Sequence, residues 1–183
     1  MALRPILTYP DLALKHRAAP VKNIDGAVAQ LVEDMAETMY AAPGVGLAAT
    51  QVGAAQRVIV LDVHGENEPP GKRLMKLINP EIVERDGEIV WEEACLSVPD
   101  LTAPVKRARR VLVRAWTSEQ KEVEVEAEEL LAVALQHEID HLEGKLFLDH
   151  LSRLKRDLYR TRQKKREKQG RKPDDRPTRR HVI

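Results

Sequence analysis

Residues 128–142 read EELLAVALQHEIDHL, and the rest of the fold can be worked out from this stretch. Its first half is apolar over much of a helical surface, which predicts a central, buried helix. Its second half contains His137, Glu138 and His141 in the pattern H-E-x-x-H. Residues i and i+4 lie on one helix face, so both imidazoles can reach a single ion, and the glutamate then lies beside the water on that ion.

The alternative for these polar residues is a solvent-facing strip on an amphipathic helix. The helix is strongly apolar just before them, however, which favours a metal site over a solvated face. Such a site needs a third ligand, and Cys95 is the only thiol in the chain. Read alone, an isolated cysteine is usually a small buried hydrophobe. Here it lies between a strand and Pro99, where a loop could present a thiolate that a cation would keep charged.

Two further helices are predicted around this central one. Residues 23–42 have apolar positions at helical spacing, Asp25 as a plausible N-cap and Pro43-Gly44 at the end. Gly144 is well placed to terminate the central helix. A third helix is expected to start near His150 and to run into the basic C-terminal segment.

Short runs rich in Val and Ile predict strands between the first two helices. Asp86-Gly87 favours a tight hairpin between its flanking strands, and Pro80 is expected to start a bend. Residues 122–126 alternate Glu with Val, the pattern of a half-exposed strand, and form a second expected hairpin with residues 110–116. Helices and antiparallel strands in separate blocks indicate the α+β class. The expected strands comprise residues 57–63, 74–79, 81–84, 88–91, 110–116 and 122–126.

The composition is that of a soluble globular protein. The chain has 183 residues, 43% hydrophobic and 32% charged, with no apolar run near the roughly 20 residues that span a bilayer. Neither a secretory signal nor a transit segment is visible at the N-terminus, and the single cysteine fits a reducing cytoplasm. We expect one domain over residues 1–168 and a basic, disordered tail over residues 169–183.

The small net charge of +1 hides an asymmetry along the chain. Residues 151–183 contain 14 Lys and Arg and 4 Asp and Glu, so an acidic body carries a basic C-terminal segment. Such segments often meet nucleic acid or another anionic surface, although a solvated, mobile extension is the usual outcome. Tyr159 is the only aromatic residue in this segment, so no platform for stacking bases is expected.

Three motifs together resemble the signatures of the peptide deformylase family. They are GVGLAATQ at residues 44–51, EACLS at residues 93–97 and QHEIDHL at residues 136–142, in family order, and the resemblance covers roughly residues 3–165. It implies an α+β fold with antiparallel or mixed sheets packed around the H-E-x-x-H helix, an N-terminal helix and a C-terminal helical extension. Ala94 stands where the family normally has glycine, which affects the expected shape of the substrate groove and the turnover. Val45 and Val98 stand where isoleucine is common.

The resemblance implies a hydrolase that removes the formyl group from the N-terminal formylmethionine of nascent polypeptides. Cys95, His137 and His141 would hold one divalent metal ion with water in the fourth position, and Glu138 would accept the water proton and deliver it to the leaving amine. The Gln51 side-chain amide and the Leu96 backbone N–H would donate to the developing oxyanion. For Gln51 alone, an ordinary loop residue is the competing interpretation.

Further site residues follow from the same resemblance. An expected Arg107–Asp140 ion pair would brace the metal helix against the strand layer, the alternative being two unrelated surface charges. Leu130 and Val133 would also serve as core packing. The residues expected to contact substrate are Gly44, Val45, Gly46, Trp91, Glu93, Ala94, Leu130, Val133, Ala134 and His137.

One thiolate and two imidazoles suit several metals, so the donor set does not identify the ion. The family generally uses Fe²⁺ in cells, while Zn²⁺, Ni²⁺ or Co²⁺ can occupy preparations. The resemblance further implies a cytoplasmic enzyme, expected to be a monomer without membrane contact, whose basic C-terminal helix and tail could dock on the ribosome. Two competing classes stay open: a general metalloprotease with the same chemistry, and a ribosome- or RNA-associated binding protein with a vestigial site.

Overall fold

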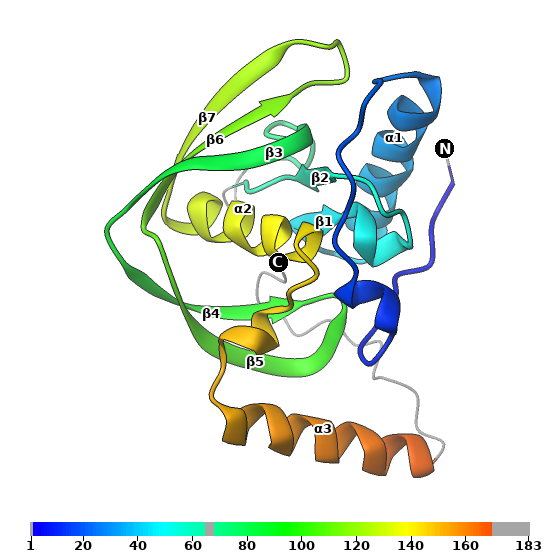
Figure 1. Ribbon diagram of the computed structural model, residues 1–183, viewed down its shortest axis with the longest axis vertical. Helices are drawn as coiled ribbons and strands as arrows, with labels where there is room; N and C mark the ends of the chain where they lie inside the picture. Colours follow the sequence, from blue (N-terminus) through cyan, green and yellow to red (C-terminus); the bar gives the residue numbers. More distant parts are fainter. Residues whose placement is uncertain (1, 65–67, 170–183) are drawn as a thin grey trace.

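The computed structural model describes residues 2–64 and 68–169, and its centre is helix α2, Glu129–Leu142. Figure 1 shows α2 between two antiparallel sheets, so the expected α+β class is confirmed. The smaller sheet pairs β4 (Ile89–Cys95) with β5 (Val98–Arg107). The larger sheet has the order β1 (Gly46–Ala48), β2 (Val58–Leu61), β3 (Met75–Asp86), β6 (Arg110–Trp116) and β7 (Glu122–Glu128).

Helix α1 spans Gly26–Ala41 and begins as its sequence predicts. The Asp25 side chain accepts hydrogen bonds from the N–H groups of Ala27 and Val28, both at 3.0 Å, which satisfies donors that the first turn leaves unpaired. The helix ends shortly before Pro43. Its apolar face packs against β2 and β3 to form one of the protein's cores, to which α1 contributes the buried side chains of Val28, Leu31, Val32, Met35 and Met39.

The region around Asp86-Gly87 differs from the prediction. Strand β3 continues through Pro80, with Asn79 at a φ of +53° and a register shift in its pairing with β6, so the expected bend does not divide it. Gly87 does turn the chain, at a φ of +61° that favours glycine. The strands on either side nevertheless do not pair with each other, because β3 pairs with β6 and β4 pairs with β5. The expected hairpin is therefore wrong, and the turn is a corner between two sheets.

The second expected hairpin is confirmed. Strands β6 and β7 pair in register from Arg110 opposite Glu128 to Trp116 opposite Glu122. Along β7 the glutamates are exposed while Val123 and Val125 pack against the central core. This alternation follows from the two-residue period of a strand.

Helix α2 is buried over most of its length, as its apolar sequence predicts. Residues 132–139 are all at most 7% exposed, and they pack between the large sheet and residues of β4. The helix ends at Leu142, two residues before Gly144. Burial on this scale means that the histidines and glutamate at its C-terminal end lie inside the protein, where polar groups need partners.

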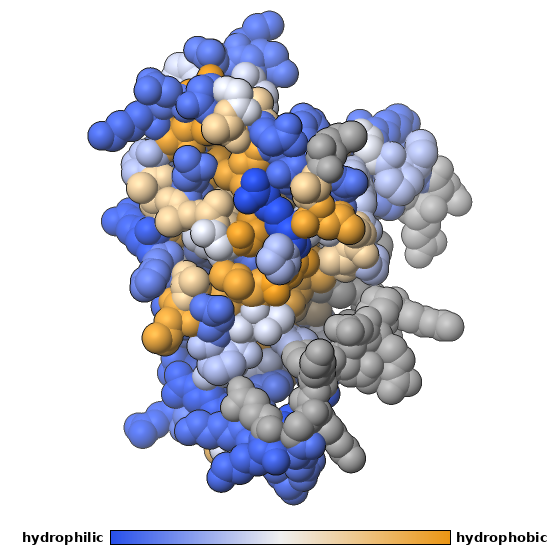
Figure 2. Space-filling model, turned by 90° about the vertical axis from the view of Figure 1, so that its right-hand side faces the viewer, coloured by the Kyte–Doolittle hydropathy of each residue, from blue (hydrophilic) through white to orange (hydrophobic). Residues whose placement is uncertain are grey.

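The C-terminal helix α3 spans Arg153–Lys168 and lies along one end of the molecule (Figure 1). Tyr159 attaches it to the small sheet by donating a hydrogen bond to the carbonyl oxygen of Pro99 at 3.0 Å. Figure 2 shows hydrophilic side chains at this end and a band of apolar side chains across the middle of the same face. The expected tail lies, from residue 170, outside the described residues. Among residues 2–64 and 68–169, no helix has the length and apolar character needed to cross a membrane.

Candidate metal centre

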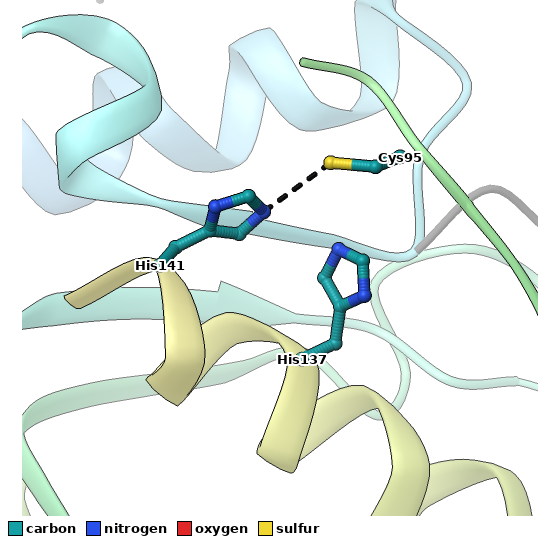
Figure 3. A group of neighbouring side chains, drawn as sticks. All are labelled: Cys95, His137 and His141. Atoms are coloured by element: carbon teal, nitrogen blue, oxygen red, sulfur yellow. Dashed lines mark hydrogen bonds between the residues drawn. The ribbon is translucent and has the colours of Figure 1, made fainter. Parts of the chain in front are cut away.

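Cys95, His137 and His141 converge on one point although they come from distant parts of the chain. One ligand atom from each lies within 4.8 Å of the others, and all three residues are buried. Figure 3 shows both imidazoles rising from α2 toward the cysteine. The Sγ atom of Cys95 is 3.3 Å from Nε2 of His141. Tetrahedral ligands bonded at about 2.3 Å for sulfur and about 2.0–2.1 Å for nitrogen would lie about 3.6 Å apart, so the spacing suits a shared ion.

The hydrogen bonds of His137 fix which of its nitrogens can bind an ion. Its Nδ1 is 2.8 Å from Oε2 of Glu93, and a carboxylate can only accept, so Nδ1 carries the proton. Nε2 therefore keeps its lone pair, and it is buried without a hydrogen-bond partner among the residues that the structure describes. An orphaned acceptor of this kind in a protein interior is costly unless something binds it. The residues present thus fit a metal ion.

Burial decides the charge states of His141 and Cys95, the other two converging side chains. Burial, and next the charge of His137, hold the pKa of His141 well below its usual value, so its imidazole is neutral, the form that binds metals. Burial, followed by the charge of Glu138, raises the pKa of the Cys95 thiol, although the backbone N–H groups of Ser97 and Val98 oppose this. The protein's own groups do not make a thiolate here, whereas a cation at the shared point would.

Cys95 is the last residue of β4, whereas the sequence placed it in a loop. The turn at Leu96 and Ser97 leads directly into β5, and the pairing register shifts between Ala94 and Cys95. A strand end holds the thiol more firmly than a free loop would. Ala94 itself pairs with Thr102 inside β4 and has no left-handed φ, so the backbone at this position does not require glycine.

Glu138 lies against the backbone of β1. A Cβ atom added to Gly46 would be 2.4 Å from Oε1 of Glu138, so only glycine leaves room for this carboxyl group. Glu138 is fully buried, and within residues 2–64 and 68–169 neither of its oxygens has a hydrogen-bond partner. Burial and the charge of Glu93 raise its pKa well above the usual value. A carboxyl group in such a setting is suited to exchanging a proton near neutral pH.

Gln51 lies beside the cysteine with its amide held at both ends. Its Oε1 accepts from the N–H of Ala48 at 2.8 Å, and its Nε2 donates to Oγ of Ser97 at 3.1 Å. Nε2 is also 3.7 Å from Sγ of Cys95. Leu96 is close to Gly44, since a Cβ atom there would be 2.8 Å from its Cδ1. Gln51 thus contacts Cys95, and Leu96 follows Cys95 directly in the chain, so both adjoin the three converging side chains.

The residues expected in an apolar substrate pocket are largely brought together. Val45, Val133 and Ala134 are buried in the same core cluster, and Trp91 and Leu130 pack against it while partly exposed. Leu130 also lines a cavity of about 560 Å³ between α2 and the segment after β2. Partial exposure leaves Trp91 and Leu130 available to a ligand, whereas the buried members provide packing.

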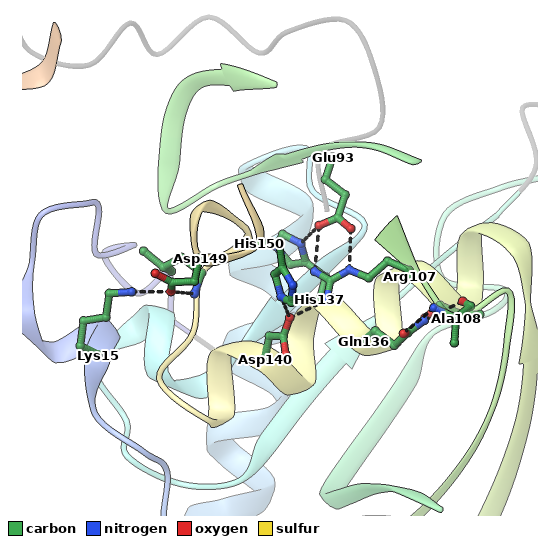
Figure 4. A network of polar contacts seen from close by, with 11 residues as sticks. Lys15, Glu93, Arg107, Ala108, Gln136, His137, Asp140, Asp149 and His150 are labelled. Atoms are coloured by element: carbon green, nitrogen blue, oxygen red, sulfur yellow. Dashed lines mark hydrogen bonds and ion pairs between the residues drawn. The ribbon is translucent and has the colours of Figure 1, made fainter. Parts of the chain in front are cut away.

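Behind His137, charged side chains form a continuous network (Figure 4). Arg107 pairs with both oxygens of Glu93, at 2.7 and 3.0 Å, and its NH1 is 2.5 Å from Oδ2 of Asp140. Burial opposes ionisation of Glu93, but hydrogen bonds from His137 and Arg107 lower its pKa to about 2. Burial likewise opposes ionisation of Asp140, yet hydrogen bonds from His150 and Arg107 hold its pKa below its usual value. Both carboxylates are thus ionised at neutral pH.

Three residues that sequence reasoning missed contact this centre. His150 lies with its Nε2 2.7 Å from Oδ2 of Asp140, Phe147 stacks on the ring of His137, and Ser97 accepts from Gln51. Ser97 is part of the EACLS motif, and this is the one sequence feature that could have indicated a role for any of the three residues. His150 and Phe147 follow α2 in a 3₁₀ turn, and nothing in their local sequence indicates which side chains they meet.

Comparison with known proteins agrees with this geometry. The family model described as polypeptide deformylase matches residues 3–157. A peptide deformylase of Syntrophobacter fumaroxidans is 53% identical over 170 residues, covering 93% of this chain and 99% of that protein. The crystal structure of a peptide deformylase from Legionella pneumophila, 46% identical, superposes with a TM-score of 0.84 over 94% of this chain and 100% of that one.

A peptide deformylase from Ehrlichia chaffeensis, solved in complex with actinonin, is 39% identical with a TM-score of 0.84, covering 91% of this chain and 99% of that one. The match of the family model extends over most of the chain, and the relatives are similar along nearly their whole length. The chain therefore belongs to the polypeptide deformylase family, the metal-dependent hydrolases that remove the formyl group from the N-terminal methionine of nascent proteins.

Proposed function

We propose that the deformylation reaction takes place at the centre formed by Cys95, His137 and His141, with these three residues as the metal ligands. The observation that carries the proposal is their convergence within 4.8 Å, next to a buried Glu138 whose oxygens have no hydrogen-bond partner in the described part of the chain. A divalent ion held there would acidify its bound water and polarise the formyl carbonyl. We assign Fe²⁺ as the ion in cells, with Zn²⁺, Ni²⁺ or Co²⁺ as replacements in preparations, all compatible with this donor set.

Glu138 is assigned the proton transfers. Its carboxyl group is next to the metal-binding face of α2 and is pressed against Gly46, so it has little freedom to turn away. It accepts a proton from the attacking water and delivers that proton to the departing amine, which leaves poorly unless it is protonated. Burial and the charge of Glu93 raise the pKa of Glu138, which makes the carboxylate a stronger base for the first transfer, and the proton that it then holds is available to the amine.

Gln51 and Leu96 are assigned to the oxyanion that develops on the formyl oxygen. Ser97 and the Ala48 N–H hold the Gln51 amide at both ends, so its Nε2 is oriented before substrate arrives. Pre-oriented donors act without reorganisation at the moment of reaction. The N–H of Leu96 follows the cysteine directly in the turn between β4 and β5 and would be the second donor.

The substrate peptide is assigned to the free edge of the large sheet. β1 is the edge strand of that sheet, and Gly44, Val45 and Gly46 lead into it or form part of it. An extended formylmethionyl peptide can add to such an edge through main-chain hydrogen bonds. Trp91 and Leu130 would contact the methionine side chain, with the buried Val133 and Ala134 and the ring of His137 packed behind them. Ala94 would flank the substrate from β4, and Glu93 would act on it only through His137.

The direct test is release of formate from formyl-Met-Ala by anaerobically prepared iron protein, with metal content measured on the same sample. We expect stoichiometric iron, formate release and no cleavage of internal amide bonds. The Glu138→Ala variant should keep its metal and lose hydrolysis. Wild-type activity in that variant would refute the role of Glu138. Cleavage of unformylated peptides would indicate a general metalloprotease, and a metal-loaded but inactive wild type would indicate a binding protein with a vestigial site.

We further propose that residues 1–168 act as one monomeric catalytic unit in the cytoplasm and that α3 docks on the ribosome. The first half of α3 carries exposed basic side chains together with Leu154 and Leu158, which are 70% and 61% exposed. Contact with ribosomal RNA phosphates would be salt-dependent. Co-sedimentation with ribosomes should weaken when Lys155 and Arg156 are changed to Glu and when salt is raised. Unchanged binding at both conditions would exclude α3 as the docking surface.

A further inference from the structure

Two carboxylates compete for one guanidinium behind the metal ligands. Arg107 donates its Nε–H and one NH2 hydrogen to Glu93 and one NH1 hydrogen to Asp140. The Arg107 and Glu93 side chains are 4% and 0% exposed, so neither can exchange its partner for bulk water. If Asp140 had no other donor, it would draw Arg107 toward itself and away from the two-bond geometry on Glu93.

His150 supplies that other donor. Its Nε2 is 2.7 Å from Oδ2 of Asp140 and 3.3 Å from NH1 of Arg107. A guanidinium can only donate and a carboxylate can only accept, so the proton on Nε2 points to Asp140. Oδ2 of Asp140 therefore receives two donors, one from Arg107 and one from His150.

We propose that His150 is a positioning residue for the metal centre: by donating to Asp140, it leaves Arg107 aligned on Glu93, which in turn orients the ring of His137. The inference rests on the proposed metal site. Partners behind a ligating histidine fix its tautomer and the direction of its lone pair, and so contribute to metal affinity. Figure 4 shows this sequence of contacts from His150 through Asp140, Arg107 and Glu93 to His137.

The segment that carries His150 is held in place by other contacts. Asp149 accepts from the N–H of Leu146 at 2.9 Å and pairs with Lys15 at 2.6 Å, and Phe147 and Leu148 are buried. The His150 side chain is itself 34% exposed and lines a polar cavity of about 820 Å³. Replacing its imidazole should therefore leave the 3₁₀ turn intact, so an effect on the metal would not be a consequence of local unfolding.

Three variants of the full chain test the proposal. His150→Ala removes the donor, and His150→Gln keeps an N–H at nearly the position of Nε2. Lys15→Ala breaks the ion pair of the neighbouring Asp149 and is the control for damage to the turn. Each is loaded with Co²⁺, and two properties are measured: the rate of cobalt loss to a chelator and the thiolate-to-cobalt absorption band. Formate release, as kcat and KM separately, is a third readout.

We expect His150→Ala to lose cobalt about three- to tenfold faster than wild type, less than the 10–100-fold typical of partners in direct contact with a ligand. Its absorption band should persist, and kcat should fall more than KM rises. His150→Gln and Lys15→Ala should stay within about twofold of wild type. Equal rates for His150→Ala and wild type, equal losses in His150→Ala and Lys15→Ala, or no rescue by Gln would each overturn the proposal. A wild type without the thiolate band would instead refute the metal site itself.

Discussion

The polar side chains on the two sides of the C-terminal part of α2 differ in whether they have hydrogen-bond partners. Toward Cys95, Nε2 of His137 and both oxygens of Glu138 are buried and have no partner among the described residues. On the other side, Glu93, Arg107 and Asp140 bind one another and His137 with hydrogen bonds of 2.5–3.0 Å. The helix thus has an open side, toward Cys95, where buried polar atoms have no partner among the described residues, and an opposite side where the polar groups form a hydrogen-bonded network.

We interpret the side with unpaired polar groups as the site of the reaction and the hydrogen-bonded network as its structural support. Leaving a polar group buried without a partner costs about 1–3 kcal/mol, so a stable fold accepts several together only where a ligand completes them. The network behind His137 needs no ligand and is expected to hold the open side in position. Changes on the open side should therefore reduce activity with little effect on folding, and changes in the network should reduce stability.

The largest effect is expected from Gly46→Ala. Its Cβ atom would be 2.4 Å from Oε1 of Glu138 and would displace the carboxyl group, so kcat should fall about 10²–10⁴-fold, the range of general acid–base catalysis. Gly26→Ala is the matched control, because a Cβ atom there meets nothing within 4 Å. Steady-state kinetics and urea unfolding of both variants make the comparison. Retention of full activity in Gly46→Ala would contradict the assigned position of Glu138.

Arg107→Ala should mainly affect stability. It leaves Glu93 and Asp140 without their shared cation, and breaking a buried pair in this way typically costs about 3–5 kcal/mol. Arg114→Ala is the control, since its side chain is 49% exposed and its ion pairs with Glu122 and Glu124 lie on the surface, where about 0–1 kcal/mol is usual. Urea unfolding measures both. Equal losses of unfolding free energy in the two variants would show that the buried ion pairs of Arg107 stabilise the protein no more than the surface ion pairs of Arg114.

Gln51→Leu tests whether the Gln51 amide donates to the oxyanion on the side of α2 that faces Cys95. Removing one oxyanion donor typically costs about 2.7–4 kcal/mol in the transition state, so kcat should fall about 10²–10³-fold while KM changes little. Metal content, measured by elemental analysis, should not change. A variant that lost its metal instead would assign Gln51 to holding Cys95, from which its Nε2 is 3.7 Å away.

The smallest expected effect is on the pH dependence of stability, and it comes from the Lys15–Asp149 ion pair, which belongs to neither side of α2. Burial opposes ionisation of Asp149, but the Leu146 N–H and Lys15 lower its pKa below the usual value. A lowered folded-state pKa gives stability that is present above the unfolded value of about 3.9 and is lost as pH falls through the folded value. Lys15→Ala should therefore flatten the acid side of the stability curve, measured as urea midpoint against pH. An unchanged slope would mean that this ion pair does not contribute.

Helices and one hairpin could be predicted because their signals are local. The Asp25 cap and the spacing of Val28, Leu31 and Val32 define α1 within a few residues, and alternation defines β7. The Asp86-Gly87 turn was recognised, but turn chemistry does not determine which strands pair across it. Strand β5 was missed because Pro99 and Pro104 obscure its pattern; proline is tolerated there because the strand has a free edge.

The proposed metal ligands could be predicted because each is marked by a local feature of the sequence. The i, i+4 spacing identifies His137 and His141, and Cys95 is the single thiol. The support behind them could be predicted only in part: the Arg107–Asp140 contact was expected from the family resemblance. His150 and Ser97 had to be found in the structure, because their roles depend on side chains that meet only after folding.

X-ray absorption on zinc-loaded protein tests the central claim most directly, because it reports the atoms bonded to the ion. The account predicts one sulfur at about 2.3 Å and two imidazole nitrogens at about 2.0–2.1 Å, with the sulfur absent in Cys95→Ser. A wild-type shell of nitrogen and oxygen alone would contradict the assignment of Cys95, His137 and His141 as the ligands of one ion.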